Sequence, residues 1–184
     1  MSFSVCIFCG SSFGDDPRYT HAARETGVEI ARRGWTLVYG GARVGLMGVV
    51  ANAALDAGGR VVGVVPRFLY EREVGHDGIT SLEIVGSLTE RKLRMGELSD
   101  AFLALPGGIG TLDEMFEAWS WSQVGLQSKP SGLLNVAGYY DALVSFIERA
   151  TAAGFVKPQH RQWLSVSDDV GELLDGFRRR SSPP

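Results

Sequence analysis

Three loops of this 184-residue sequence combine glycine with residue types that can bind a phosphorylated molecule: Cys9 to Ser12, Tyr39 to Gly48 and Pro106 to Thr111. Glycine lets backbone N–H groups converge closely on an anion, and a loop that opens a helix adds the positive end of the helix dipole. Tight turning explains glycine in any one of these loops equally well. Three such loops at one sheet edge favour a phosphate-bearing ligand.

Glu114 is the sharpest candidate for chemistry beside these loops. It falls one turn inside the helix that we expect after Thr111, where a carboxylate could reach the sugar of a bound nucleotide. There it would orient a water molecule or stabilise an oxocarbenium-like transition state. The spacing Thr111-x-x-Glu114 also fits a capping box, in which Glu114 accepts a hydrogen bond from the Thr111 N–H. Spacing alone leaves both interpretations open.

The same helix has an apolar stripe with the periodicity of a core-facing surface. Its members are Leu112, Met115, Phe116 and Trp119. Glu114, Glu117 and Trp121 are expected to point the opposite way. Because an indole is costly to leave wholly in water, this second face is expected to meet a partner subunit or a ligand.

Arg91 is the second candidate. If Ser87-x-x-Glu90 starts a helix, one side of that helix carries Leu88, Arg91, Met95 and Leu98. A guanidinium aimed inward with apolar residues needs an anionic partner. A structural salt bridge, a bound anion and the Glu114 carboxylate all remain open as that partner. Its neighbour Lys92 fits a solvated side chain and a ligand contact equally well.

Other polar residues give weaker signals. Glu73, in the loop Pro66 to Ser81, could touch a base or sugar, although an exposed surface charge is the favoured interpretation. The histidines His21, His76 and His160 show no metal-ligand spacing, so no metal is predicted. The first strand lacks a following G-x-G-x-x-G, which disfavours a dinucleotide cofactor. We therefore predict no cofactor.

Apolar runs of strand length alternate with amphipathic stretches of helix length, which indicates an α/β fold with a mostly parallel sheet and helices on both faces. The expected strands are 5–9, 36–39, 60–65, 82–85, 101–105 and 132–135, with a possible seventh near 163–166. The expected helices are 18–33, 46–57, 89–98, 112–123, 139–153 and 170–179. We predict one Rossmann-like domain over residues 1–180 and a disordered tail at 181–184. Ligands on such sheets bind beyond the carboxyl ends of the strands, where the glycine loops lie.

Composition narrows the function. The net charge of -3 and the absence of a long basic run argue against nucleic acid as a partner. The chain shows neither a leader nor an apolar stretch of membrane-spanning length, so a cytoplasmic enzyme is expected. Cys6 and Cys9 form a C-x-x-C, but within a strand their thiols would face opposite ways. We interpret them as core thiols and not as a redox pair.

Two motifs resemble those of the LONELY GUY cytokinin-activating proteins. The segment Pro106 to Glu114 is similar to the family's P-G-G-x-G-T-x-x-E motif, and Glu90-Arg91-Lys92 to its R-K-containing motif. Further stretches that resemble the family in order and spacing are Phe8 to Ser12, Tyr39 to Gly48 and Gly132 to Tyr140. The combined pattern spans nearly the whole chain and is far more specific than any single loop.

The resemblance implies a Rossmann-like homodimer with paired active sites near the subunit interface. It also implies metal-independent hydrolysis of AMP or an N6-substituted AMP to the free base and ribose 5-phosphate. Arg91 and Glu114 match the family's catalytic pair. The matching substrate-binding positions are Glu73, Lys92, Gly107, Gly108, Ile109, Gly110, Thr111, Leu112, Asp113 and Ser120. No membrane or nucleic acid is implied as a partner.

Some residues depart from the family pattern. Leu88-Thr89 stands where many relatives have Met-His, Ala42 where many have a third glycine, and Ser120 where many have threonine. None of these changes removes a proposed catalytic group, but they bear on base preference. Three alternatives remain: a lysine decarboxylase using pyridoxal phosphate, a carrier of a phosphorylated cofactor such as the molybdenum cofactor, and a hydrolase for other nucleoside monophosphates. A carrier would not need the pair of Arg91 and Glu114.

Overall fold

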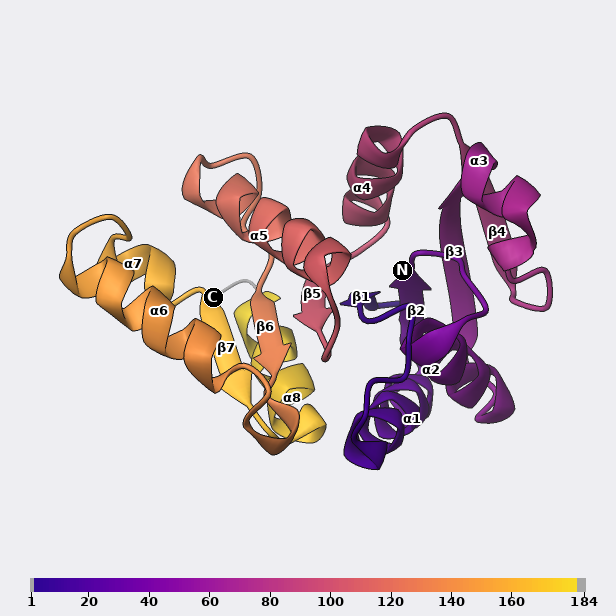
Figure 1. Ribbon diagram of the computed structural model, residues 1–184, viewed down its shortest axis with the longest axis horizontal. Helices are drawn as coiled ribbons and strands as arrows, with labels where there is room; N and C mark the ends of the chain where they lie inside the picture. Colours follow the sequence, from indigo (N-terminus) through magenta and orange to yellow (C-terminus); the bar gives the residue numbers. More distant parts are fainter. Residues whose placement is uncertain (1, 182–184) are drawn as a thin grey trace.

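A computed structural model describes residues 2–181, apart from the side chains of Glu73 and Val74. Seven strands form one sheet in the order β4-β3-β2-β1-β5-β6-β7, and all neighbouring strands are parallel (Figure 1). They are β1 (Ser4–Phe8), β2 (Thr36–Tyr39), β3 (Arg60–Pro66), β4 (Ser81–Val85), β5 (Ala101–Ala104), β6 (Ser131–Leu134) and β7 (Leu164–Ser167). The predicted α/β class and the seventh strand are confirmed.

Helices provide the crossover connections that parallel strands require. The α-helices are α1 (Pro17–Arg32), α2 (Gly45–Asp56), α3 (Arg67–Leu69), α4 (Leu88–Glu97), α5 (Ile109–Gln123), α6 (Asp141–Ala152), α7 (Pro158–Arg161) and α8 (Val170–Ser181). A π-helical turn, η1 (Tyr70–Val74), follows α3, and a 3-10 turn, η2 (Val136–Gly138), precedes α6. Within residues 2–181, no helix is long and apolar enough to cross a membrane.

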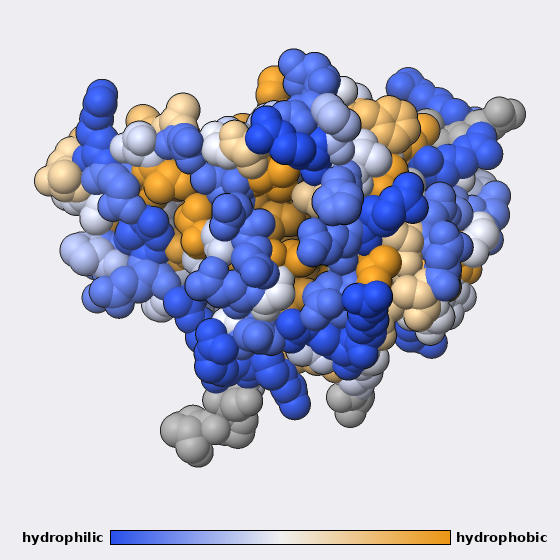
Figure 2. All heavy atoms as spheres, turned by 90° about the horizontal axis from the view of Figure 1, so that it is seen from below, coloured by the Kyte–Doolittle hydropathy of each residue, from blue (hydrophilic) through white to orange (hydrophobic). Residues whose placement is uncertain are grey.

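The helices cover both faces of the sheet and create two cores. Residues of α1, α2 and α8 pack on one face, and residues of α4, α5 and α6 on the other (Figure 1). Figure 2 views the molecule from the side of α1, α2 and α8. Hydrophilic side chains predominate on that surface, with apolar residues visible between them. Cys6 belongs to one core and Cys9 to the other, and both are free and buried. The interpretation of these residues as core thiols is confirmed.

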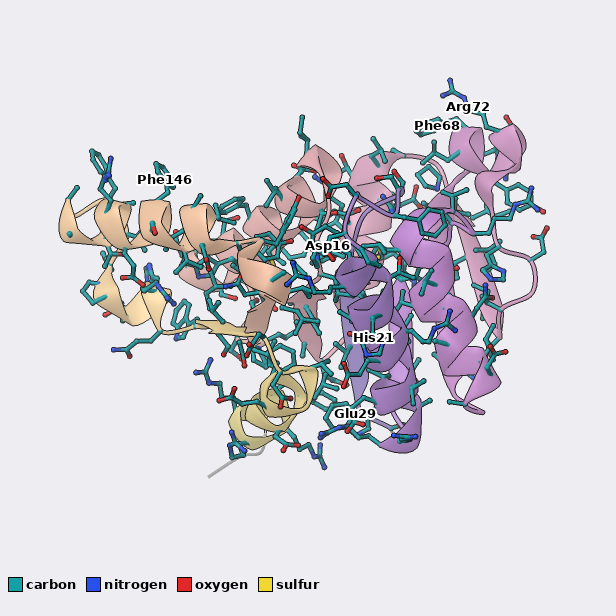
Figure 3. All side chains as sticks on the ribbon, turned by 60° about the horizontal axis from the view of Figure 1, so that its bottom comes forward. Asp16, His21, Glu29, Phe68, Arg72 and Phe146 are labelled. Carbon is teal, nitrogen blue, oxygen red and sulfur yellow. The ribbon has the colours of Figure 1, made fainter. Side chains whose placement is uncertain are left out.

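The differences from the expected elements concern short helices and helix ends. The predicted loop after β3 contains α3 and η1, from which Phe68 and Arg72 project at the outer end (Figure 3). These turns and α7 are too short to show the periodicity by which a helix is recognised in sequence. Helix α8 includes Ser181, so the predicted tail begins one residue too early, and residues 182–184 lie outside the described part of the chain.

Candidate active site

A pocket of about 610 Å³ opens where the loops after β1, β2 and β5 meet, at the carboxyl edge of the sheet. The connections from β1 and β5 diverge there, and open α/β sheets bind ligands at such a switch point. The lining residues are Cys9, Gly10, Ser11, Gly40, Ala42, Val44, Met47, Val65, Leu69, Arg91, Gly108, Ile109, Gly110, Thr111 and Glu114. A second cavity of about 580 Å³, lined by Trp163 and Arg180 among others, lies where the chain enters β6 and has no glycine-rich helix start.

The N-terminus of α5 offers this pocket uncapped backbone donors. Gly108 is the N-cap residue, no side chain caps the helix, and the helix begins at Ile109. The N–H groups of residues 109–111 lack intrahelical acceptors, and the helix dipole favours an anion beside them. Because Thr111 lies inside the first turn and does not cap the helix, the capping-box interpretation of Glu114 is wrong. The segment Gly108 to Thr111 lines the pocket, as an anion site requires.

The orientation of α5 differs from the expected one. Its buried residues are Thr111, Met115, Ala118, Trp119 and Ser122, whereas Phe116 is 37% exposed. Glu114 lies three residues after Thr111 and four before Ala118, so it faces the buried side of the helix. Its predicted outward direction is therefore wrong. The error arises because Thr111, Ala118 and Ser122 on the buried face are small or polar, so an apolar stripe does not include them.

Arg91 and Glu114 form a largely buried ion pair at the wall of the pocket. Arg91 Nη1 lies 2.8 Å from Glu114 Oε1, and each side chain is only 11% exposed. Arg91 Nε also donates a hydrogen bond to the backbone carbonyl of Val64 in β3, at 3.1 Å. The inward direction predicted for Arg91 is confirmed, and of the three partners left open, the Glu114 carboxylate is the one the structure shows.

Gly40 makes room for the Arg91 side chain. A Cβ atom at Gly40 would overlap Arg91 Nη2 and would lie 2.9 Å from Arg91 Cζ and 2.5 Å from Met47 Cε. The glycine that follows β2 therefore leaves room for the guanidinium at the strand end, where it meets both Glu114 and the carbonyl of Val64. The Arg91 position thus depends on β2, β3 and α5 together.

Burial sets the electrostatics of Glu114. Desolvation raises its pKa, and the attraction of the Arg91 guanidinium lowers it by less. Among the more distant charges, Asp113 and Glu117 raise the pKa and Lys92 lowers it. A carboxyl with a raised pKa beside a fixed cation is a common arrangement for acid–base or electrostatic catalysis, although structural ion pairs also produce it.

Among the predicted substrate-binding residues whose side chains the structure describes, Lys92, Gly107, Leu112, Asp113 and Ser120 do not line the pocket. Lys92 Nζ lies 3.0 Å from Asp113 Oδ2 and 2.8 Å from Glu117 Oε2, which makes a charge network on the flank of α4 and α5. Ser120 is exposed, and its hydroxyl donates to the Glu117 carbonyl.

Of the remaining predicted substrate-binding residues, Leu112 and Gly107 lie behind the pocket wall, and the structure does not describe the side chain of Glu73. Leu112 packs against the core on the α5 side of the sheet, and Gly107 lies beneath the first turn, against Thr111 and Gly10. Glu73 falls in η1, and its side chain lies outside the described part of the structure.

Several pocket residues were not predicted as substrate contacts from the sequence. They are Cys9, Gly10, Ser11, Gly40, Ala42, Val44, Met47, Val65 and Leu69. Most of them lie in glycine loops whose importance the sequence does indicate, so the place was predictable and the individual contacts were not. Leu69 reaches the pocket from α3, an element that was not expected.

The structure shows the contacts of the three lysines and the spacing of the residues that could bind a metal. Lys129 Nζ donates to the carbonyl of Gly96 at the end of α4, and Lys157 is the N-cap residue of α7. Lys92 is engaged in the acidic network on the flank of α4 and α5. None of the three lines the pocket. Within the described residues, no three His, Cys, Asp or Glu side chains gather as a metal site would need.

Comparisons with known proteins identify the family of this chain. A family model described as "possible lysine decarboxylase" matches residues 47–177. The cytokinin riboside 5'-monophosphate phosphoribohydrolase of Rhodococcoides fascians is 50% identical over 176 residues, which cover 95% of this chain and 89% of the relative. An enzyme of the same name from Arabidopsis thaliana is 44% identical over 170 residues, covering 92% of this chain and 80% of the relative.

Among solved structures, the molybdenum cofactor binding protein of Rippkaea orientalis superposes with a TM-score of 0.76. It covers 99% of both chains at 21% sequence identity, a likeness that shows the fold alone. The family model and the sequence relatives, which span most of the chain, go further. They show that the chain belongs to the LONELY GUY family of cytokinin riboside 5'-monophosphate phosphoribohydrolases.

Proposed function

We propose that this protein hydrolyses the N-glycosidic bond of AMP or an N6-substituted AMP, releasing the adenine-type base and ribose 5-phosphate. The relatives' names describe this reaction for cytokinin riboside monophosphates. The observation that carries the proposal is the buried pair of Arg91 and Glu114 in a pocket whose floor is the uncapped start of α5.

The spacing along α5 relates the phosphate to the reacting bond. Glu114 follows the first helical residue, Ile109, by five positions, which is about 7.5 Å along the helix axis at 1.5 Å per residue. In this proposal the N–H groups of Gly108 to Thr111 bind the 5'-phosphate. The ribose then lies beside the Glu114 carboxylate, and the base extends across the pocket. The contacts of Glu73, Lys92 and Ser120 with substrate stay predictions.

The proposed reaction needs no group beyond the substrate and water. The bond from C1' of the ribose to the base nitrogen breaks, the base takes the bonding electrons, and a water oxygen bonds to C1'. The proton lost by the water balances the proton gained by the base. Glu114 orients that water or stabilises the positive charge that develops on the ribose. Arg91 holds the carboxylate in position and partly offsets the cost of its burial.

The raised pKa of Glu114 predicts the pH dependence of catalysis. A protonated carboxyl cannot serve either role, and a raised pKa means that protonation begins at higher pH than for an ordinary glutamate. We expect kcat/KM to fall on acidification with an apparent pKa above 4.5, the ordinary glutamate value. The check is kcat/KM for AMP in constant-ionic-strength buffers, with protein integrity followed by circular dichroism. A profile that stays flat to pH 4.5 in folded protein would be inconsistent with an essential ionised Glu114.

Release of free base from a nucleotide panel tests the function itself. The purified protein is incubated with AMP, N6-isopentenyl AMP, GMP and CMP, and also with adenosine, which lacks the 5'-phosphate. Chromatography measures the base released. We expect turnover of the adenine nucleotides and a large loss with adenosine, because the helix N-terminus has no anion to bind. If neither adenine nucleotide releases base, the proposal is refuted.

A lysine decarboxylase activity, as the family model's description suggests, would require a lysine amine that forms a Schiff base with pyridoxal phosphate. The side chains of Lys92, Lys129 and Lys157 all lie outside the pocket. The residues present therefore do not fit this cofactor. Incubation with pyridoxal phosphate should leave no internal-aldimine absorbance in the dialysed protein.

A second surface supports a homodimer, as the family resemblance implies. Exposed apolar side chains on and after α4 and α5 include Leu93, Val124 and Leu126, which are 52%, 71% and 75% exposed. Leu93, Trp121 and Leu126 line a shallow groove there. We propose that a second copy covers this surface. Light scattering that reports the 19.9 kDa mass of a single chain would contradict the dimer.

A further inference from the structure

Two adjacent tyrosines after β6 hold the loop that precedes α5. The Tyr140 hydroxyl donates a hydrogen bond to the carbonyl of Leu105, and the Tyr139 hydroxyl donates one to the carbonyl of Gly107, each at 2.6 Å. Between them, the carbonyl of Pro106 accepts the N–H of Gly10 at 3.1 Å. Three consecutive carbonyls of this loop therefore have donors supplied by two other segments of the chain.

These bonds fix the direction of the opposing N–H groups. All peptide bonds of the described chain are trans, and a trans peptide directs the C=O of one residue and the N–H of the next to opposite sides. Holding the Gly107 carbonyl toward Tyr139 therefore turns the N–H group of Gly108 away from that tyrosine. Gly108 lines the pocket, whereas neither tyrosine does.

The turn that carries the tyrosines is itself strained and braced. Ala137 has a φ of 55°, the one non-glycine residue with positive φ in the described chain, and Gly138 follows with a φ of 74°. Asn135 accepts the N–H of Tyr140 and donates to Asp141, both at 2.7 Å. Backbone strain of this kind persists where the surrounding structure enforces it, and it gathers at functional sites.

Without such bonds the loop would have little reason to keep one orientation. Gly107 and Gly108 are consecutive and permit many backbone conformations, so the peptide group between them can rotate. The Tyr139 hydroxyl contacts that peptide group directly. Tyr140 and Gly10 hold the two carbonyls before it.

We infer that Tyr139 and Tyr140 are positioning residues that hold the Pro106 to Gly108 segment so that the N–H group of Gly108 is directed at the substrate's 5'-phosphate. The inference rests on the proposed function, because it assumes that a nucleotide phosphate binds at the start of α5. Neither hydroxyl touches the reacting bond. Their loss should therefore weaken phosphate binding and leave the chemical step nearly unchanged.

The test is removal of the hydroxyl alone. Tyr139 is 41% exposed, so Tyr139→Phe should fold as the parent protein does. We expect KM for AMP to rise about tenfold, the effect of one lost hydrogen bond, with kcat changing less than threefold. The inhibition constant of ribose 5-phosphate should rise by a similar factor. Tyr140→Phe should act in the same direction, with thermal melting recorded because that residue is buried.

Tyr19→Phe is the matched control. The Tyr19 ring packs edge-on against Tyr139, at 5.4 Å between ring centroids, but its hydroxyl has no hydrogen-bond partner among the described residues. It should leave both kinetic constants unchanged. Unchanged KM and inhibition constant in Tyr139→Phe, or a fall confined to kcat, would overturn the inference.

Calorimetric binding of ribose 5-phosphate separates this inference from the proposed function. If the parent protein binds ribose 5-phosphate and Tyr139→Phe binds it about tenfold more weakly, the positioning role holds even where base release from AMP is absent. If the parent protein releases base and both proteins bind ribose 5-phosphate equally, the function holds and the positioning role fails.

Discussion

Glu114→Gln should lower kcat for base release from AMP by about 10²- to 10³-fold, the usual cost of losing one electrostatic stabiliser. Glutamine keeps an oxygen that can accept from Arg91 Nη1, so the contact seen at 2.8 Å can persist without its charge. The variant removes the negative charge that would face the ribose cation. Initial rates and a circular dichroism melt together check the result.

The matched control for Glu114→Gln is Glu83→Gln. Glu83 pairs with Arg94 of the same helix that carries Arg91, at 2.6 Å, but the pair is partly exposed and lies outside the pocket. Surface pairs contribute little to stability, so the control should keep its activity. Arg91→Ala should lose activity to an extent comparable with Glu114→Gln, because it leaves the buried carboxylate without its cation. Undiminished turnover in either pocket variant would refute the catalytic assignment.

Gly40→Ala should reduce kcat/KM by about 10²-fold, although Gly40 contributes no side chain. The added Cβ would overlap Arg91 Nη2, so the guanidinium must move from Glu114 and from the Val64 carbonyl. A displacement of about 1 Å at a catalytic group can cost this much. Gly40 does not have a positive φ, so alanine strains no backbone torsion, and the effect comes through contact alone.

The control for Gly40→Ala is Gly176→Ala in α8. A Cβ there would meet only the Arg179 Nη2 atom, at 3.9 Å. Alanine should therefore be tolerated without loss of activity, and helix propensity favours it. Steady-state kinetics for both variants provide the comparison. Equal kcat/KM in the Gly40 variant and the parent would mean that the position of Arg91 does not matter for turnover.

The fold was largely predictable because its strongest signals are local. Each strand is a short apolar run bounded by turn residues, and alternation with helices dictates a parallel sheet. Arg91 could be directed inward because it shares one side of α4 with Met95, which is buried. The elements that escaped prediction, α3, η1, η2 and α7, have five or fewer residues. Such lengths are too short for periodicity to act as a signal.

The site was less predictable because its contacts depend on helix phase and on chain segments far apart. The buried face of α5 includes Thr111, Ala118 and Ser122, which no apolar stripe would reveal, so Glu114 was expected outside and lies inside. A Cβ at Gly40 would overlap Arg91, which belongs to α4, a distant element of the chain. The hydrogen bond from the Tyr139 hydroxyl to the Gly107 carbonyl joins residues 32 positions apart. Spacing within one element contains no information about such contacts.

The most direct test of the central claim is a crystal structure of the Glu114→Gln protein soaked with AMP, since the slowed variant should retain its substrate. The account predicts the 5'-phosphate within hydrogen-bonding distance of the N–H groups of Gly108 to Thr111 and the ribose beside residue 114. A nucleotide bound elsewhere, for example in the cavity beside Trp163, with the start of α5 unoccupied, would contradict it.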